Sequence, residues 1–221
     1  MTLATATAPP DANLALVAYG RLRAMLLQGE LAAGQAVQER RLADLLGLSR
    51  TPVRDALGRL EGERLLARNG GQLVVATITL HEIADILAIR RLLEGDAARQ
   101  AALRMDATEI GAIRGAILGM SDRGMTTDEA HWAVDDVIHL GIAEASGNIE
   151  LRRLVGELRQ RTRMFGLHRI PARFGSGRRE HLAILDAIEA RAPDEARDRM
   201  QHHIDQARDA IIATLQRSPA P

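Results

Sequence analysis

Apolar residues recur at helical spacing over residues 13–29, and this stripe predicts a first amphipathic helix. A short second helix is expected over 40–46, because Gly47 supplies the left-handed residue at which helices commonly end. Ser49 can cap a third helix by accepting a backbone N–H, and that helix is expected to run to about Leu65.

The pattern then changes to two short apolar runs that flank Asn69-Gly70-Gly71, which predicts a glycine-turned β-hairpin. After Thr79 the helical spacing returns, and no strand pattern interrupts it. We expect helices at roughly 80–104, 106–120, 126–145, 148–168, 177–191 and 194–216. The predicted fold class is therefore mainly α: an N-terminal winged helix-turn-helix plus a C-terminal all-α antiparallel helical bundle.

This change of pattern divides the chain into two expected domains. A winged helix-turn-helix covers residues 11–76, a linker covers 77–80, and an all-helical domain covers 81–216. Residues 1–10 are rich in Thr, Ala and Pro and show no periodicity, so we expect a disordered tail there. Residues 217–221 form a second expected tail.

Composition narrows the class of protein. The chain of 221 residues has no cysteine, which excludes disulfides, zinc fingers and thiol nucleophiles. We find no signal peptide pattern at the start and no run of about 18 uncharged apolar residues, so we expect a cytoplasmic protein with no membrane partner. Nine arginines face seven acids over 11–76, and twenty face twenty-two over 77–221. This asymmetry is too weak to predict nucleic-acid binding.

The order helix, glycine turn, capped helix and hairpin is typical of a winged helix-turn-helix, whose third helix presents its N-terminal side chains to base edges. Arg50 and Arg54 share one face of that helix, from which guanidinium groups can reach guanine or phosphate. Ser49 and Thr51 can reach phosphate oxygens, and Arg40 could contact the backbone or a base edge beside them. An isolated arginine pair is usually a solvated surface, but the wing and the capped turn favour DNA contact.

The same residues carry a family resemblance. The segment Glu39-Arg40-Arg41-Leu42-Ala43, followed by Leu48-Ser49-Arg50-Thr51-Pro52-Val53-Arg54-Asp55-Ala56-Leu57, resembles the signature of the GntR family of bacterial transcription regulators. The resemblance implies that Arg40, Arg50 and Arg54 contact double-stranded operator DNA and that Gly70 or Gly71 approaches the minor groove. The chain departs from the family at Arg64, where a helix-ending glycine is usual, and a left-handed backbone costs more for arginine.

One aspartate and three histidines of the helical half are expected to converge. Asp135 and His139 are four residues apart and so share a helix face. His181 and His203 each lie about eleven residues from the centre of the turn at 191–194, so an antiparallel hairpin brings them level. This donor set suits a divalent metal ion, with Zn²⁺, Ni²⁺ and Mn²⁺ all acceptable.

Two other histidines compete for the site. His203 is preferred to His202 because it shares a buried stripe with Met200 and Ile204. His131 lies one turn before the aspartate and stays an alternative ligand. Any of these histidines taken singly is better explained as an ordinary core or surface residue, but the convergence of four side chains favours a site.

The helical half also resembles a known domain. Asp135 and His139, then Ala145-Ser146-Gly147-Asn148, Glu180-His181 and His203-Ile204, resemble the FCD domain of the FadR subfamily over nearly all of 80–215. The resemblance implies that the aspartate and the histidines bind a metal that helps to hold a small organic acid. Ile138 departs from an aromatic that is common in the family, which changes the packing beside the pocket.

An effector-binding arginine is expected in the first helix of this domain. Arg90 or Arg91 resembles a family arginine that pairs with a carboxylate effector, and we choose Arg90; a surface ion pair with Glu94 is the alternative. The sequence thus predicts a homodimeric, effector-controlled transcription regulator that is not an enzyme. The alternative is a metal-dependent hydrolase, which lacks a general base because Glu180 points about 100° away from its neighbour His181.

Overall fold

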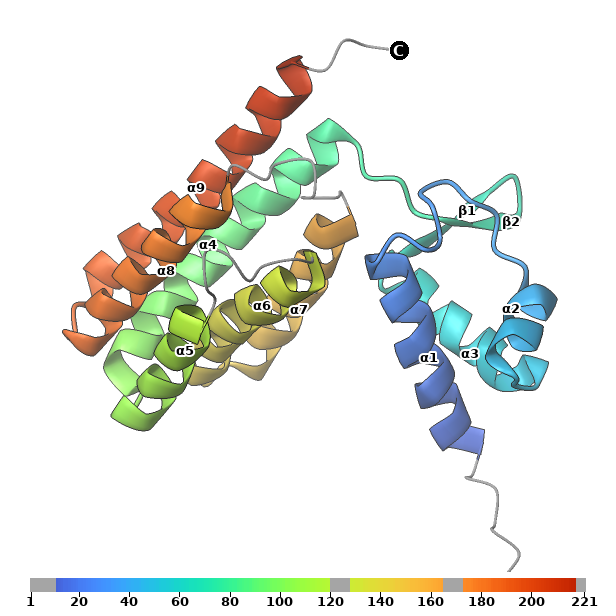
Figure 1. Ribbon diagram of the computed structural model, residues 1–221, viewed down its shortest axis with the longest axis horizontal. Coiled ribbons are helices and arrows are strands. Elements are labelled where there is room, and N and C mark those ends of the chain that lie inside the picture. Colours follow the sequence, from blue (N-terminus) through green and yellow to red (C-terminus); the bar gives the residue numbers. More distant parts are fainter. Residues whose placement is uncertain (1–10, 120–127, 165–172, 218–221) are drawn as a thin grey trace, which may run out of the picture. The chain divides into compact units, whose positions relative to one another are not determined.

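A computed structural model of the protein describes residues 11–119, 128–164 and 173–217 (Figure 1). The chain divides into two compact units, Met1–Thr77 and Ile78–Pro221. The tails expected at residues 1–10 and 218–221 lie outside the described residues, whereas Arg217 is the last residue of a helix.

The N-terminal unit contains three helices and one hairpin among its described residues. They are α1 (Asp11–Leu27), α2 (Glu39–Leu46), α3 (Arg50–Gly62), β1 (Leu66–Asn69) and β2 (Gln72–Val75). Helix α3 packs against both α1 and α2. Leu22, Val53 and Leu60 are fully buried between them, as expected for apolar residues at helical spacing. This packing fixes α3 while its N-terminal end stays exposed.

The wing is a two-stranded antiparallel hairpin in which Leu66 pairs with Val75 and Asn69 with Gln72. Gly70 and Gly71 form its turn with φ of 56° and 83°. Two-residue hairpin turns need such positive φ values, which glycine adopts easily. The segment before α2 pairs with β2 on its other side, because the Val37 N–H donates to the Leu73 carbonyl at 2.8 Å.

Both ends of α3 differ from expectation. Ser49 occupies the N-cap position with extended backbone angles, but its hydroxyl accepts no capping hydrogen bond. The helix ends at Gly62 rather than near Leu65, because Arg64 adopts the left-handed conformation with φ of 59°. Arginine at such a position costs about 1–2 kcal/mol.

A cluster of polar side chains beside Arg64 ties down this helix end. The Tyr19 hydroxyl of α1 donates to both carboxylate oxygens of Glu63, at 2.8 and 3.0 Å. Arg59 donates to the same carboxylate at 3.0 Å and stacks over the Tyr19 ring. These contacts explain how the fold holds the strained backbone that follows.

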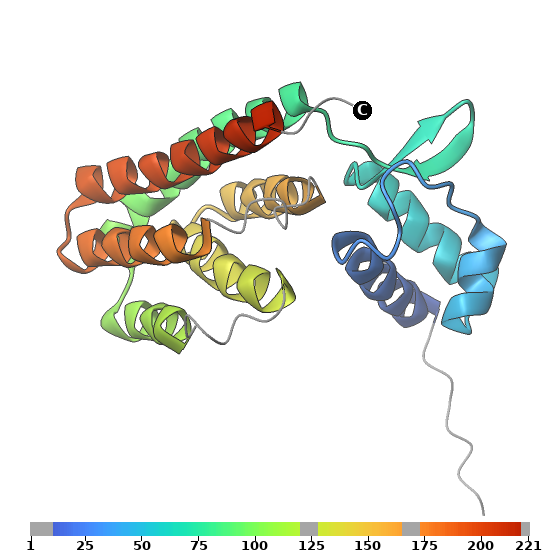
Figure 2. The ribbon, with the colours of Figure 1, turned by 45° about the horizontal axis from the view of Figure 1, so that its top comes forward.

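The C-terminal unit is entirely helical in its described part. Its elements are α4 (Leu80–Arg104), α5 (Ala107–Gly119), α6 (Asp128–Ala145), α7 (Ile149–Met164), α8 (Arg173–Glu189) and α9 (Pro193–Arg217). Helix α4 packs against α6, α7, α8 and α9, and α8 with α9 forms a hairpin beside it (Figure 2). Together with the N-terminal unit, this arrangement confirms the predicted mainly α fold class.

Several helix boundaries in this unit were predicted a few residues off. Helix α8 begins at Arg173 rather than 177, so that two glycines, Gly175 and Gly177, lie within its first turns. The ends predicted at 120 and 168, and the start predicted at 126, lie outside the described residues.

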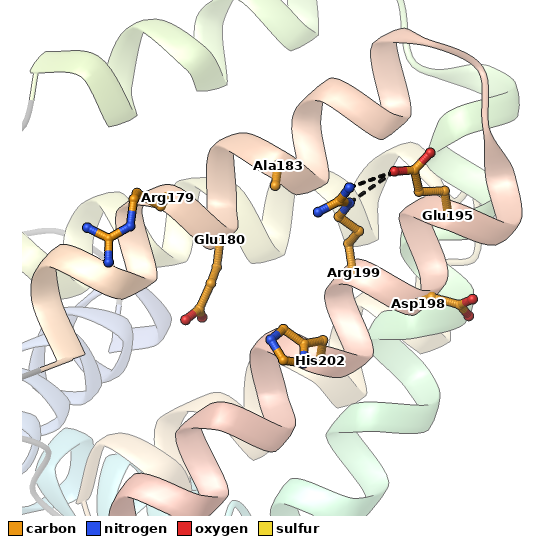
Figure 3. Close-up of a pocket in the computed structure, with 7 residues that line it drawn as sticks. All are labelled: Arg179, Glu180, Ala183, Glu195, Asp198, Arg199 and His202. Carbon is orange, nitrogen blue, oxygen red and sulfur yellow. Dashed lines mark hydrogen bonds and ion pairs between the residues drawn. The ribbon is translucent and has the colours of Figure 1, made fainter.

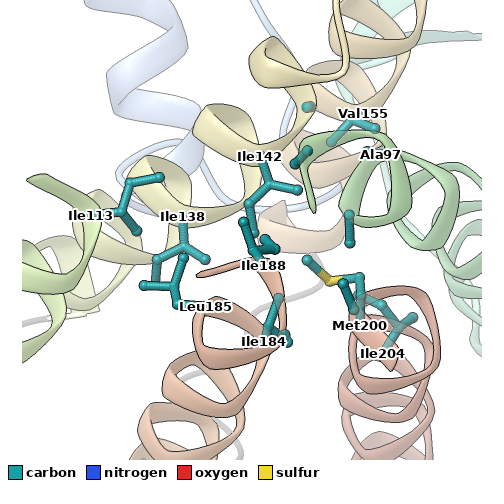
Figure 4. Packing of buried hydrophobic residues seen from close by; sticks show 14 of the residues in the cluster. Ala97, Ile113, Ile138, Ile142, Val155, Ile184, Leu185, Ile188, Met200 and Ile204 are labelled. Carbon is teal, nitrogen blue, oxygen red and sulfur yellow. The ribbon is translucent and has the colours of Figure 1, made fainter. Parts of the chain in front are cut away.

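The core of the helical unit is aliphatic and takes side chains from all of its helices, α4 to α9 (Figure 4). Ile138 and Ile142 of α6 meet Ile184 and Ile188 of α8 there, and all four side chains are fully buried. Small residues bring α4 and α9 close, since a Cβ on Gly95 would lie 2.8 Å from the Gln201 Cγ. Four of these helices, α4, α6, α8 and α9, also carry residues of the polar cluster described below.

Candidate nucleic-acid interface and candidate metal centre

The exposed end of α3 carries the arginines singled out in the sequence, and a carboxylate from α2 holds them. Glu39 Oε1 accepts from Arg50 Nε at 2.7 Å and from Arg54 Nη2 at 2.9 Å, while Oε2 accepts from Arg54 Nε at 2.8 Å. The two arginine side chains are each 63% exposed. Both guanidinium groups therefore stay exposed to solvent while Glu39 fixes their positions.

Electrostatics at this end of α3 favour the ionised pairs. Hydrogen bonds from Arg54 and then Arg50 lower the pKa of Glu39 to about 2. The hydrogen bond to Glu39 in turn raises the pKa of Arg54. Glu39 therefore stays an anion at neutral pH, and the spacing of 11 and 15 residues to its partners explains why sequence periodicity could not reveal it.

The other residues predicted to contact DNA also lie at the surface. Ser49, Thr51 and Arg40 are exposed, and within the described part of the chain no hydrogen bond or ion pair joins the Arg40 side chain to another residue. Gly70 and Gly71 are exposed at the tip of the wing. Arg68, which the sequence interpretation missed, donates to Glu61 at 2.9 Å and braces the base of the wing.

In the helical unit, the structure brings together Asp135, His139, His181 and His203, and one donor atom of each lies within 4.8 Å of the others. Helix α6 supplies the first two residues, and α8 and α9 supply one histidine each. The hairpin places His181 Nε2 at 3.2 Å from His203 Nε2. Asp135 Oδ1 lies 3.5 Å from His181 Nε2 and 3.7 Å from His139 Nε2.

A second layer of charged side chains orients these groups. Glu94 of α4 accepts from Nδ1 of His139, and Glu180 accepts from Nδ1 of His203 at 2.7 Å. Arg159 of α7 donates to Asp135 Oδ2 at 2.8 Å. Because His139 and His203 each give the Nδ1 proton to a carboxylate, their Nε2 lone pairs are left for the centre of the cluster.

Burial and these partners decide the protonation states. Burial lowers the pKa of His139 to about 4 and, with the nearby His203, holds the pKa of His181 well below its usual range. Burial would raise the pKa of Asp135, but the Arg159 guanidinium together with the neighbouring His139 and His181 holds that pKa well below normal. The same competition, with Arg90 as the cation, lowers the pKa of Glu94. The imidazoles of His139 and His181 are thus neutral beside an ionised aspartate.

This donor set fits a divalent transition metal. A tetrahedron with metal–ligand bonds of about 2.1 Å has edges of about 3.4 Å, close to the 3.2–3.7 Å of the three donor pairs given above. His139 Nε2 is also buried without a hydrogen-bond partner among the described residues, an arrangement that is costly unless something binds it. His131, the alternative ligand, is not part of this cluster.

Arginines surround the cluster. Arg90, the predicted effector residue, is 5% exposed and donates to Glu94 at 2.6 Å and to Thr162 at 3.3 Å. The ion pair with Glu94 therefore exists but is buried, not on the surface. Arg91 instead pairs with Asp205 nearer the surface. Arg159, which the sequence interpretation missed, is 2% exposed, and its Nη1 has no hydrogen-bond partner among the described residues.

A separate groove of about 660 Å³ lies along the α8–α9 hairpin (Figure 3). Its lining residues are Arg179, Glu180, Ala183, Glu195, Asp198, Arg199 and His202. Exposed His202 faces this groove, in contrast to buried His203. Glu180 lines the groove and accepts from His203, so it supports a cluster histidine and does not act as a base toward the cluster centre.

The Ala145-Ser146-Gly147-Asn148 segment is a helix junction. Ser146 Oγ donates to the Ala143 carbonyl at 2.6 Å, and Gly147 takes a left-handed φ of 72° that ends α6. Asn148 Oδ1 then accepts from the Leu151 N–H at 3.0 Å and caps α7. This junction fixes the angle between the helices that carry Asp135 and Arg159.

A winged helix-turn-helix joined to a helical unit with a buried histidine and aspartate cluster defines a class of DNA-binding transcription regulators. The bacterial regulatory proteins, gntR family, match at residues 14–75, and the FCD domain matches at residues 85–206. The chain belongs to the GntR family, in the group that carries an FCD domain. It is a transcription regulator and not an enzyme, and the hydrolase alternative finds no support.

Relatives agree with this assignment. The chain is 29% identical to an uncharacterized HTH-type transcriptional regulator in an unstable DNA locus of Streptomyces ambofaciens, over 91% of this chain and 86% of that one. It is 28% identical to the Nta operon transcriptional regulator of Aminobacter aminovorans, over 82% and 87%. The fold matches E. coli McbR/YncC with a TM-score of 0.78 at 23% identity, over 92% and 97%. No helix in the described ranges is long and apolar enough to cross a membrane.

Proposed function

We propose that this regulator binds a divalent metal at Asp135, His139, His181 and His203. We further propose that a small carboxylate effector, bound beside the metal, controls the affinity of the protein for operator DNA. The convergence of these four donors, with the lone pair of His139 Nε2 otherwise unmatched, carries the proposal. Each donor is fixed by a neighbour or by helix packing before any metal arrives, which favours tight binding.

The metal would supply Lewis-acid affinity for an anionic oxygen, and Zn²⁺, Ni²⁺ or Mn²⁺ suits the donor set. The arginines beside the cluster would complete recognition of a carboxylate. Arg90 remains our proposed effector residue, although Glu94 and Thr162 already engage it. Arg159 is the stronger addition, because its buried Nη1 lacks a partner and a carboxylate pairs well with guanidinium.

On the DNA side, Arg50 and Arg54 would contact bases in the major groove, while Ser49 and Thr51 bind phosphates. Arg40 would contact the backbone beside them, and Gly70 and Gly71 would let the wing approach the minor groove. A homodimer would place two such surfaces on a palindromic operator about one helical turn apart, which multiplies affinity. The effector would act by changing the spacing of the two surfaces.

The test is operator binding by metal-loaded and metal-stripped protein. Electrophoretic mobility shifts with the duplex upstream of the protein's own gene should show specific binding at low salt. A panel of small carboxylates should change the midpoint of thermal unfolding only when metal is present. A protein that binds no specific duplex contradicts the DNA proposal, and a carboxylate response that survives chelation contradicts the metal proposal.

A further inference from the structure

Glu39 is an acidic residue placed among the arginines at the exposed N-terminal end of α3. Its carboxylate contacts both Arg50 and Arg54, at distances between 2.7 and 2.9 Å. The Glu39 side chain is 21% exposed, against 63% for each arginine. The acid is thus the sheltered partner in a three-residue cluster, and the arginine tips are its exposed part.

The hydrogen bonds to Glu39 leave free the guanidinium donors that would contact DNA bases. A guanidinium has five N–H donors, and Glu39 takes only the Nε donor of Arg50 and the Nε and one Nη2 donor of Arg54. The terminal fork of Arg50 and the Nη1 group of Arg54 stay uncommitted to Glu39. End-on contacts to guanine O6 and N7 use those remaining donors.

An acid here has two opposite effects on DNA binding. Its negative charge lies near the phosphates and weakens binding to any duplex. Its hydrogen bonds also hold two flexible side chains in one geometry, which reduces the conformational freedom lost when a specific base is bound. The first effect is independent of sequence, whereas the second favours only duplexes that match the fixed geometry.

We infer that Glu39 is a positioning residue that fixes Arg50 and Arg54 for base recognition, and so determines sequence specificity instead of overall affinity. This inference rests on the proposed DNA contacts of the two arginines. An alternative role, in which the acid blocks the arginines until DNA displaces it, predicts a different result: removal would strengthen binding to all duplexes equally.

The test compares two duplexes of equal length by fluorescence anisotropy: one selected by the wild-type protein from a randomised pool, and one scrambled. Glu39→Gln should lower the ratio of selected to scrambled affinity about tenfold, the size of one mispaired contact. Affinity for the scrambled duplex should stay equal or rise. Glu39→Asp, which keeps the charge but shortens the reach, should lower the ratio similarly.

Asp44→Asn is the matched control, because Asp44 is an exposed acid on the same helix without a contact to either arginine, and its ratio should stay at the wild-type value. Circular dichroism establishes that each variant folds. A double variant with Arg54→Lys should lose less than the sum of the single losses. An unchanged ratio in both Glu39 variants overturns the inference, and equal changes in affinity for the two duplexes give that result. Wild-type protein that binds both duplexes equally overturns the DNA contacts as well.

Discussion

Two polar clusters of this molecule are each organised around a glutamate, one at the surface and one in the core. At the end of α3, a carboxylate holds two arginines whose side chains are mostly exposed. In the helical unit, Glu94 holds Arg90 and His139, and all three side chains are almost completely buried. Exposed ion pairs contribute about 0–1 kcal/mol, whereas removing one partner of a buried pair costs about 3–5 kcal/mol. The exposed cluster can therefore change with little loss of stability, while the buried one is part of the fold.

The largest expected effect follows from breaking the buried cluster. Glu94→Ala leaves the Arg90 guanidinium buried without its carboxylate, and should lower the free energy of unfolding of the helical unit by about 3–5 kcal/mol. Urea denaturation measures this loss. The control is Glu195→Ala, which removes an exposed pair with Arg199 and should cost under about 1 kcal/mol. Equal losses in the two variants would contradict the contrast.

A smaller effect concerns the donors themselves. Zinc at a hundredfold excess over its dissociation constant should stabilise stripped wild-type protein by about 2.7 kcal/mol, because it binds only the folded state. His203→Ala should lose most of this stabilisation, whereas the exposed neighbour variant His202→Ala should keep it. Thermal unfolding with and without zinc makes the comparison. Full stabilisation of the His203 variant would exclude this residue as a ligand.

Arg54→Ala should separate DNA binding from stability. The variant should bind the selected duplex about 1–3 kcal/mol more weakly, because a base contact is lost. Its thermal midpoint should change little, since an exposed ion pair contributes little. Arg153→Ala, an exposed arginine on α7, is the charge-matched control and should bind normally. Wild-type affinity of the Arg54 variant would remove this residue from the interface.

The smallest expected effect is a gain. Arg64→Gly should stabilise the N-terminal unit by up to about 1 kcal/mol, because glycine adopts the left-handed conformation without steric cost. Arg64→Ala should give no such gain, since alanine keeps the Cβ that causes the strain. Differential scanning calorimetry of both variants tests this. An equal gain of stability in the Arg64→Ala variant would mean that removal of the charge, and not relief of backbone strain, causes the stabilisation.

The sequence could predict what short-range periodicity determines. Spacing alone identified the histidine and aspartate set that the fold brings together, because a helix turn and a helix hairpin fix those distances. It could not identify Glu39, or Arg159 with its contact to Asp135, because neither a helix turn nor a short hairpin relates the partners in these pairs. The alternative that it offered for Arg90, a surface ion pair with Glu94, has the right partner but the wrong location, since nothing in the local pattern shows that α4 is covered by other helices. The strain expected at Arg64 is present, but its support by Tyr19 and Glu63 depends on tertiary packing.

Metal stoichiometry tests the central claim most directly. Stripped wild-type protein is loaded with Zn²⁺, Ni²⁺ or Mn²⁺, dialysed extensively, and analysed by mass spectrometry of the metal, alongside Asp135→Asn. The proposal predicts about one ion per wild-type chain for at least one of these metals, and a substantial loss in the variant, whose amide keeps the shape but not the charge. Wild-type protein that retains no metal, or a variant that retains as much as wild type, would contradict it.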